Sequence, residues 1–384
     1  MDVKVVIGSN FGDEGKGLMT DYFCHQSETT PIVVLHNGGA QRGHTVVTPE
    51  GKRHVFHHFS AGTFTDAHTY FAESFIVNPM EFIRESEELE FTPTIYIHPL
   101  CRITTPYDMI ANILINEKTQ HGSCGMGINE TIVRDYVWNY TYKSMCDMSM
   151  DKNLDYLTQI RDYYKTRLLS FGVNEIPREW KDVWYSDDLL LHFLCDCNKM
   201  KDKVIPSQPY LLSDYDTVIF EGAQGLLLDK DNTEYYPHLT PSNTGLQNPY
   251  HMIETYIPGS DVEVCYVTRT YMTRHGAGRF DTECPKELIN TDMHDKTNEP
   301  NPYQGALRYG TMDMFGLKQR ILKDMEGAPH YKMSIAITHF DESNLTCTEE
   351  EFRDFIYGFS TLYTAHGETR NDVTRNEMIK NSKT

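Results

Sequence analysis

The sequence predicts an α/β fold in which helices flank a large, mostly parallel central sheet. Short runs of β-branched and aromatic residues recur along the chain, and most are continuously apolar instead of alternating with polar residues. That pattern is typical of strands buried on both faces of a parallel sheet. The runs are VKVVIGS (3–9), PIVVLHNGG (31–39), TYFAESFIV (69–77), TPTIYIHP (92–99), DTVIFEGAQG (216–225), DVEVCYVTRTY (261–271) and MSIAITHF (333–340).

Glycine-rich or polar segments follow several of these runs. Because ligands of open α/β sheets bind outside the carboxyl ends of the strands, we expect the functional site there. The chain has 384 residues, and we predict one domain over 1–384. A polar stretch of helical character at about 145–205 predicts a helical insertion, and about 376–384 a loose tail.

Composition excludes several classes of function. The formal charge of −20 argues against binding to nucleic acid or to an anionic membrane. No apolar run approaches the ~20 residues of a membrane span, and the N-terminus lacks the pattern of a secretory leader. The nine cysteines are odd in number and show no paired C-x-x-C spacing, which favours reduced thiols. We therefore expect a cytoplasmic protein.

The segment GSNFGDEGKG (8–17) has the character of a phosphate-binding loop. It follows the first predicted strand, contains four glycines and carries Lys16. The common nucleotide-binding loop places Ser or Thr after this lysine to hold magnesium, whereas here Gly17 follows it. Asp13 and Glu14 are also unusual, because a loop that binds anions would gain nothing from two carboxylates as such.

Other segments with small or polar residues also follow predicted strands or occur between predicted elements. Each alone is equally consistent with a structural turn, and a histidine such as His44 alone is more often structural. Their combination is more specific. The segments are NGGAQRGHTVV (37–47), HGSCGMGINET (121–131), FEGAQGLLLD (220–229), TPSNTG (240–245), TRHGAGRFDTE (273–283) and AITHFDES (336–343).

The ordered set GDEGKG, GGxQxGHT, GSCGxG, EGAQGxLLD, TxSNT, TRxGAGxFxTE and a late TxxD resembles the adenylosuccinate synthetase family. The resemblance extends from residue 3 to about 375 and skips mainly the helical insertion. It implies the P-loop-like, GTP-binding architecture of that family. It also implies a ligase of purine biosynthesis that joins L-aspartate to IMP with hydrolysis of GTP, giving adenylosuccinate, GDP and phosphate.

The resemblance implies three catalytic residues. Asp13 matches the general base that removes the N1 proton of the purine, and it also coordinates Mg²⁺ together with the carbonyl of Gly43. His44 matches the general acid at the transferred phosphoryl group, and Gln224 matches the residue that holds the 6-oxygen. A carboxylate inside a phosphate loop is then explained, because Mg²⁺ offsets its repulsion of the phosphates.

The resemblance also implies three binding sets. GTP would be bound by Gly12, Glu14, Gly15, Lys16, Gly17, Gly43, His44, Thr45, Asp341 and Gly367. The purine nucleotide would be bound by Asp13, Gln41, Ser123, Cys124, Arg134, Gln224 and Thr240. Aspartate would be bound by Asn301, Gln304 and Arg308. Arg134 matches an arginine that reaches into the neighbouring subunit's site, which implies a homodimer.

The chain departs from the family pattern around its substrates. Ser123 and Cys124 replace a pair of threonines, His339 replaces a lysine at the guanine site, and one of two arginines in the aspartate loop is missing. Three functions therefore stay open. They are the ligase acting on IMP or dIMP, the same chemistry on dGMP with GTP or ATP as donor, and a catalytically silent nucleotide-binding regulator. Retention of Asp13 favours the first, because relatives that use dGMP carry a small residue there.

Overall fold

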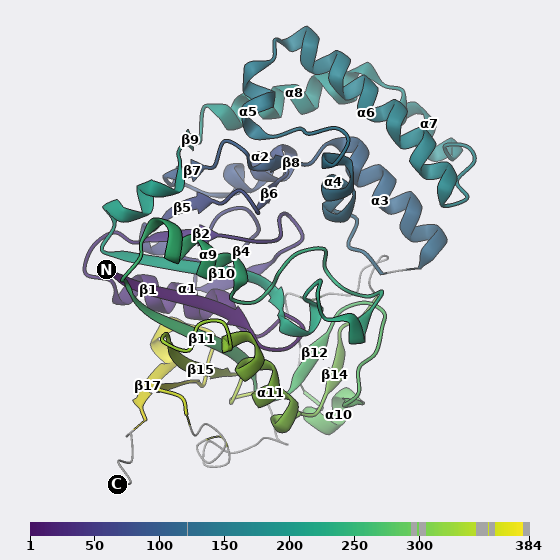
Figure 1. The fold of residues 1–384 in the computed structure, drawn as a ribbon. Coiled ribbons are helices and arrows are strands. Elements are labelled where there is room, and N and C mark those ends of the chain that lie inside the picture. The colour runs from purple at the N-terminus through teal and green to yellow at the C-terminus, as the bar shows by residue number, and fades with distance from the viewer. Residues whose placement is uncertain (121, 293–297, 299–304, 343–351, 353–357, 379–384) are drawn as a thin grey trace.

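The computed structural model describes residues 1–120, 122–292, 298, 305–342, 352 and 358–378. Within them, ten strands form one central sheet in the order β17-β16-β15-β11-β1-β10-β2-β5-β7-β9 (Figure 1). Neighbouring strands are parallel except for β16 and β17. The strands are β1 (Asp2–Gly8), β2 (Ile32–Leu35), β5 (His68–Phe71), β7 (Ile95–Ile97), β9 (Ile205–Pro206), β10 (Thr217–Gly225), β11 (Asp261–Arg269), β15 (Lys332–Thr338), β16 (Thr361–Ala365) and β17 (Val373–Glu377).

The predicted fold class is confirmed, and each predicted apolar run contains a strand. The sheet buries both faces because alternate residues enter two different cores. Val6 and Val33 belong to one core, while Val5 and Val34 belong to the other. A strand with two buried faces has no polar side, which is why these runs read as continuously apolar.

Helices cover both faces of the sheet. Met19 of α1 packs in the first core, and Ile253 of α9 and Leu317 of α11 pack in the second. Among the described residues, no helix has both the length and the apolar character needed to span a membrane. These helices and the others outside the insertion are α1 (Lys16–Gln26), α2 (Pro79–Glu88), α3 (Pro106–Thr119), α4 (Ile128–Asp135), α9 (Gln247–Tyr256), α10 (Lys286–Ile289) and α11 (Met314–Met325).

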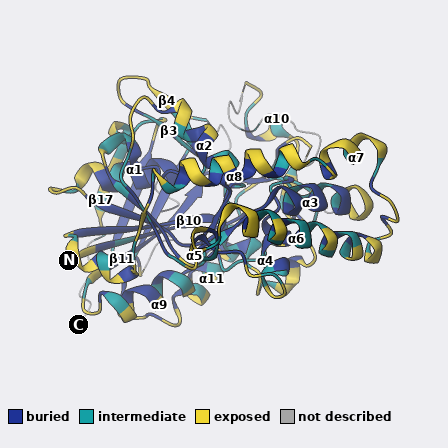
Figure 2. Cartoon of the chain, turned by 90° about the horizontal axis from the view of Figure 1, so that it is seen from above, coloured by how far each residue is buried: buried dark blue, intermediate teal, exposed yellow. Residues whose placement is uncertain are grey.

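The helical insertion is confirmed. It forms the upper part of Figure 1, and the exposed surfaces of its helices are visible in Figure 2. The fully buried Trp184 packs edge-on against Tyr107 of α3, with ring centroids 5.2 Å apart, so the insertion shares the first core. Its helices are α5 (Tyr142–Asp147), α6 (Met150–Ser170), α7 (Arg178–Trp184) and α8 (Asp187–Lys201).

Smaller elements surround the carboxyl end of the sheet. The hairpin β3 (His44–Val47) and β4 (Arg53–Phe56), the pair β6 (Ile76–Val77) and β8 (Arg102–Ile103), and the sheet β12-β14-β13 are separate from the central sheet. In that last sheet the strands are β12 (Met272–Arg274), β13 (Glu283–Cys284) and β14 (Arg308–Gly310). Short 3₁₀ turns occur at η1 (Thr63–Thr65), η2 (Pro209–Asp214), η3 (Leu226–Leu228), η4 (Thr233–Tyr235) and η5 (Arg370–Asp372).

The predicted start of the loose tail, at about residue 376, lies too early in the chain. Asn376 and Glu377 belong to β17, which pairs antiparallel with β16, and the amide of Met378 donates to the carbonyl of Ser360 at 3.0 Å. The polar sequence of this strand concealed it, because an edge strand with exposed side chains lacks the apolar pattern of a central strand. Residues 379–384 lie outside the described part of the chain.

Candidate active site

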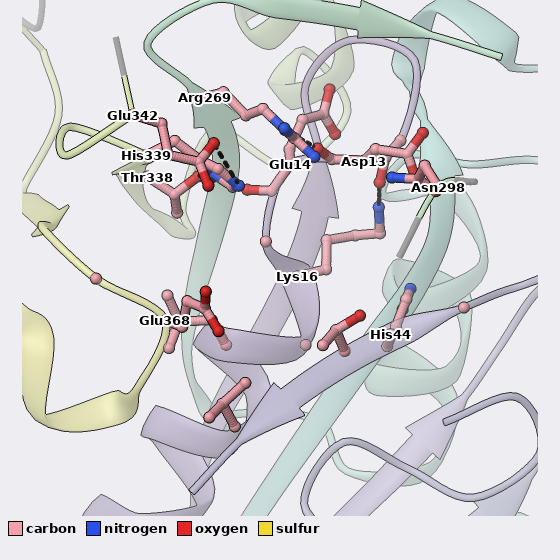
Figure 3. Close-up of a pocket in the computed structure, with 18 of the residues that line it drawn as sticks. Asp13, Glu14, Lys16, His44, Arg269, Asn298, Thr338, His339, Glu342 and Glu368 are labelled. Atoms are coloured by element: carbon pink, nitrogen blue, oxygen red, sulfur yellow. Dashed lines mark hydrogen bonds and ion pairs between the residues drawn. The ribbon is translucent and has the colours of Figure 1, made fainter. Parts of the chain in front are cut away.

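The phosphate-type loop connects the centre of the sheet to a helix N-terminus. β1 ends at Gly8 and α1 begins at Lys16, with Gly15 as its N-cap at φ 90°. The lysine ammonium folds back and donates to the carbonyl of Gly12 (Figure 3). Free amides at a helix N-terminus together with a buried lysine make a site for an anion.

The loop lies directly against the end of β10. A Cβ atom on Gly12, which has φ 125°, would lie only 2.8 Å from Cα of Gln224. Glycine is therefore required there for two reasons, the positive φ and the close approach of two backbones. The result is that Asp13 and Gln224, predicted to act on the same purine, come from segments in direct contact.

One pocket gathers every residue predicted to bind GTP, together with Asp13. Its walls come from the loop and α1, from the hairpin β3–β4, from the end of β15 and from the segment after β16 (Figure 3). The sequence prediction missed several of its residues. These are Leu18, Val47, Arg53, Arg269, Asn298, Thr338, Glu342 and Glu368, besides His339, which was predicted only as a departure from the family.

The pocket contains buried charges that are only partly compensated. Burial raises the pKa of Glu14 to about 7, with Lys16 opposing the rise, and burial lowers the pKa of Lys16. Glu14 Oε1 accepts from the amide of Asn10 at 2.5 Å, whereas its Oε2 is buried without a hydrogen-bond partner among the described residues.

Asp13 is the more accessible carboxylate of the loop, with 26% of its side chain exposed. Its Oδ2 lies 3.3 Å from Nε2 of His275, and its backbone carbonyl accepts from Nε of Arg269. Neither neighbour was predicted. His275 stands inside the motif TRHGAGRFDTE, at a position where the pattern leaves the residue type open, so no motif could have identified it.

His44 contacts a buried ionic cluster formed by Glu221 and Arg42. Its Nδ1 lies 2.5 Å from Oε1 of Glu221, whose Oε2 accepts from Arg42 Nη2 at 3.0 Å and from the amide of Ala61 at 3.2 Å. Although burial alone acts in the opposite direction, Arg42 and His44 lower the pKa of Glu221 to about 2. Burial and the nearby Arg42 lower the pKa of His44 to about 4.

Gln224 has the strained backbone typical of a functional residue. It adopts φ 59°, and its Oε1 is buried without a partner among the described residues. Both polar atoms of the Gln41 amide are also buried without a partner among the described residues. The two side chains approach one point, since a Cβ on Gly38 would lie 3.1 Å from Gln41 Nε2 and 3.7 Å from Gln224 Oε1. Unpartnered amide atoms that face one place suit a polar ligand or water.

The residues predicted to hold the 5′-phosphate already make internal contacts. The hydroxyl of Ser123 donates to Asn112 Oδ1 at 2.8 Å, and its amide donates to Asn116 Oδ1 at 3.0 Å. The neighbouring Cys124 is half-buried, and Thr240 donates its backbone amide to Leu228 at 2.9 Å. These three assignments stay predictions.

Arg308 of the predicted aspartate set is engaged within its own sheet. It makes a two-point ion pair with Glu283, at 2.8 Å and 2.5 Å, and donates to the carbonyls of Gly276 and Gly278. An incoming carboxylate would have to displace Glu283. Asn301 and Gln304 lie outside the described residues.

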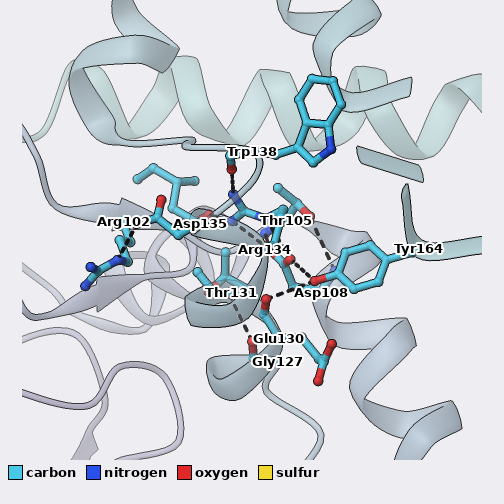
Figure 4. Close-up of polar contacts among 12 residues, drawn as sticks. Arg102, Thr105, Asp108, Gly127, Glu130, Thr131, Arg134, Asp135, Trp138 and Tyr164 are labelled. Carbon is cyan, nitrogen blue, oxygen red and sulfur yellow. Dashed lines mark hydrogen bonds and ion pairs between the residues drawn. The ribbon is translucent and has the colours of Figure 1, made fainter. Parts of the chain in front are cut away.

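The expected role of Arg134 is wrong for this structure. Its side chain is fully buried at the end of α4, where it pairs with Asp108 at 2.8 Å and donates to the carbonyls of Trp138 and Ile103 (Figure 4). The hydroxyl of Tyr164 donates to the same carboxylate at 2.5 Å. A guanidinium held this way has no reach toward another subunit. The prediction of a homodimer loses the residue on which it rested.

Comparison with known proteins agrees with this geometry. A model of the adenylosuccinate synthetase family matches residues 5–341, which is most of the chain. The chain belongs to the adenylosuccinate synthetase family. Two similar relatives are the adenylosuccinate synthetases of Hydrogenobaculum sp. (28% identity, 92% of this chain and 84% of the relative) and Aquifex aeolicus (26% identity, 94% and 83%).

Two solved structures share the fold. Fully ligated adenylosuccinate synthetase from Plasmodium falciparum superimposes with a TM-score of 0.68 at 18% identity, covering 98% of this chain and 87% of the other. Succinoaminodeoxyadenylate synthetase (PurZ) of cyanophage S-2L, bound to dGMP and to dATP as an energy donor, gives 0.66 at 14% identity, covering 97% and 95%. The family match and the relatives make the protein a ligase of the adenylosuccinate synthetase type, a family of GTP-binding enzymes of purine biosynthesis.

Arg134→Leu tests the structural role of this arginine in the synthetase. We expect the free energy of unfolding to fall by about 3–5 kcal/mol, because the substitution leaves the buried Asp108 without its cation. Arg375→Ala is the matched control, since Arg375 and its partner Glu377 are both exposed; its loss should change stability by less than about 1 kcal/mol. Chemical denaturation measures both. An unchanged stability of Arg134→Leu with a raised KM for the purine nucleotide would restore the original prediction.

Proposed function

We propose that the protein condenses L-aspartate with the 6-position of IMP or dIMP, using GTP and releasing GDP and phosphate. The observation that carries this proposal is the backbone contact between Gly12 and Gln224. It puts side by side the segment that carries Asp13, which lines the anion-binding pocket, and the segment that carries the unpartnered Oε1 of Gln224. Asp13 and Gln224 suit the 6-oxopurine, and the anion-binding pocket suits the phosphates of the donor.

The chemistry requires both side chains. The 6-oxygen of the purine is a poor leaving group until it is phosphorylated. Asp13 accepts the N1 proton, so that negative charge develops on the 6-oxygen, which attacks the γ-phosphorus while the bond to GDP breaks. The amine of aspartate then attacks C6, and phosphate leaves with the former 6-oxygen. The amide nitrogen of Gln224 would donate to the 6-oxygen during the first step, and such positioned donors are worth about 10²–10³ in rate.

Lys16 and the amides at the start of α1 would hold the phosphates of the donor, and His44 would hydrogen-bond the phosphoryl group in transfer. The donor set also suits Mg²⁺, which keeps most of its water and needs only one or two protein oxygens besides phosphate. Asp13 and the carbonyl of Gly43 both line the pocket and would hold the ion. When bound, the ion would neutralise charge on the phosphates.

The acceptor follows from Asp13. In the proposed arrangement the Asp13 carboxylate faces N1 of the base, and a 2-amino group next to N1 would crowd it. This favours a 6-oxopurine without a 2-amino group. The alternative acceptor is dGMP, which is present in the PurZ structure that shares this fold, and the donor in that complex is dATP.

GTP as donor is supported by the pocket wall that includes Asp341 and Gly367. A carboxylate accepts from the two N–H groups on one edge of guanine, an arrangement that adenine lacks. Thr338 ties this wall to the phosphate loop, because its hydroxyl donates to the carbonyl of Glu14 at 2.9 Å. His339 next to it has φ 64°, which turns the chain after β15.

Phosphate release with L-aspartate and each pair of donor and acceptor tests the proposed function. The panel consists of GTP or ATP with IMP, dIMP, GMP, dGMP or AMP. We expect the highest kcat/KM with GTP and with IMP or dIMP. A preference for dGMP would establish the alternative acceptor, and no turnover with any pair would contradict the proposed function.

Asp13→Asn should lower kcat by about 10² or more while nucleotide binding is retained, because the amide cannot accept the N1 proton. Asp13→Ser should in addition raise the use of dGMP relative to IMP. The exposed Asp281, which pairs with Arg279, supplies the control Asp281→Asn, expected to be neutral. Turnover of Asp13→Asn close to that of wild type contradicts the role of Asp13 as base.

Asp341→Asn should lower the ratio of kcat/KM for GTP over ATP by at least about tenfold, because an amide cannot accept both guanine N–H groups. Glu342→Gln is the matched control, since this neighbour lines the same pocket but accepts from the hydroxyl of Tyr271 at 2.7 Å. It should leave the preference for GTP unchanged. If the ratio of kcat/KM for GTP over ATP is the same in wild type and Asp341→Asn, other residues recognise guanine.

A further inference from the structure

The cluster beneath His44 has features that the proposed function does not use. Glu221 is completely buried and lies on β10, three residues before Gln224. It contacts His44 through one carboxylate oxygen and Arg42 through the other. A buried ionised carboxylate is costly unless every oxygen is paired, and here both oxygens accept hydrogen bonds.

The contact determines which nitrogen of His44 carries the proton. Nδ1 lies 2.5 Å from the Glu221 carboxylate, which only accepts, and 3.3 Å from Arg42 Nη2, which only donates. The much shorter contact makes Nδ1 of a neutral imidazole the donor to Glu221. The other nitrogen, Nε2, is then an acceptor without a hydrogen-bond partner among the described residues. His44 projects into the pocket near Lys16, where the phosphoryl group would be transferred (Figure 3).

Arg42 holds the carboxylate in turn. Its Nη2 donates to Glu221 Oε2 at 3.0 Å and to the carbonyl of Phe59 at 3.4 Å, and the side chain is only 2% exposed. Together with the amide of Ala61, Arg42 fixes the plane of the carboxyl group. That plane in turn fixes the rotation of the imidazole ring.

We propose that Glu221 and Arg42 are positioning residues for His44: Glu221 sets its tautomer and ring orientation, and Arg42 fixes Glu221. Neither touches the substrates. This inference rests on the role of His44 in the proposed function, but its structural part concerns the free protein and is measured there. The arrangement follows the logic of a buried carboxylate that orients a histidine for reaction.

The first test is the tautomer of His44 in the free protein, measured by NMR with isotope-labelled histidine and assigned by the signal lost in His44→Asn. We expect the Nδ1–H form in wild type, and its partial or complete loss in Glu221→Gln, whose amide is able to donate to Nδ1. Glu263→Gln is the matched control. Glu263 is a buried carboxylate on β11, which β1 separates from β10, and it pairs with Lys4 at 2.9 Å; its substitution should leave the His44 signal unchanged. The Nε2–H form in wild type overturns the proposal.

The second test is a double-mutant cycle with the best substrates from the panel. Glu221→Gln should lower kcat by about 10² or more with less than a threefold change in KM for the nucleotides, and it should add nothing in the His44→Asn background. Arg42→Lys should keep most of the activity that Arg42→Met loses. Equal effects of Glu221→Gln with and without His44 would show that Glu221 acts independently of it and would overturn the proposal. The expected tautomer in a protein that turns over no substrate pair would instead refute the proposed function.

Discussion

The active site depends on an irregular pairing between the two central strands β1 and β10. Val6 is opposite Glu221, but Gly8 is opposite Gly225, so two steps along β1 correspond to four along β10. The extra length of β10 accommodates the left-handed backbone of Gln224 and presses it against the phosphate loop. Bulges of this kind re-aim side chains next to active sites.

Because of this irregularity, the single strand β10 contributes residues to two parts of the site. Where the irregularity begins, Glu221 contacts His44; within it, Gln224 faces the space shared with Gln41. A segment near the C-terminal end of the chain completes the pocket. Arg370, after β16, donates to both oxygens of the buried Asp21 on α1, at 3.2 Å each. The segment that carries Gly367 is thereby fixed to the helix that begins at Lys16.

Much of this arrangement could be predicted from the sequence. Strands buried on both faces and glycine-rich turns leave strong local patterns, so the sheet and the pocket residues around Lys16 were predictable. Contacts between distant residues leave no such pattern. Glu221 looked like one polar residue in a strand, and Arg134 looked available because nothing in its neighbourhood revealed that Asp108, on another helix, would bury it. A short motif indicates what a residue resembles, whereas its tertiary partners decide what the side chain is able to reach.

The two edge strands of the central sheet also have a consequence for solubility. β16 is fully buried, and a bare apolar strand at an edge would be a template for pairing with other chains. On that side β17 covers it with a polar strand whose residues include Arg375 and Glu377. On the opposite side β9 has two residues, one of them Pro206, which has no amide proton to donate. Both edges therefore resist the intermolecular strand addition that leads to aggregation.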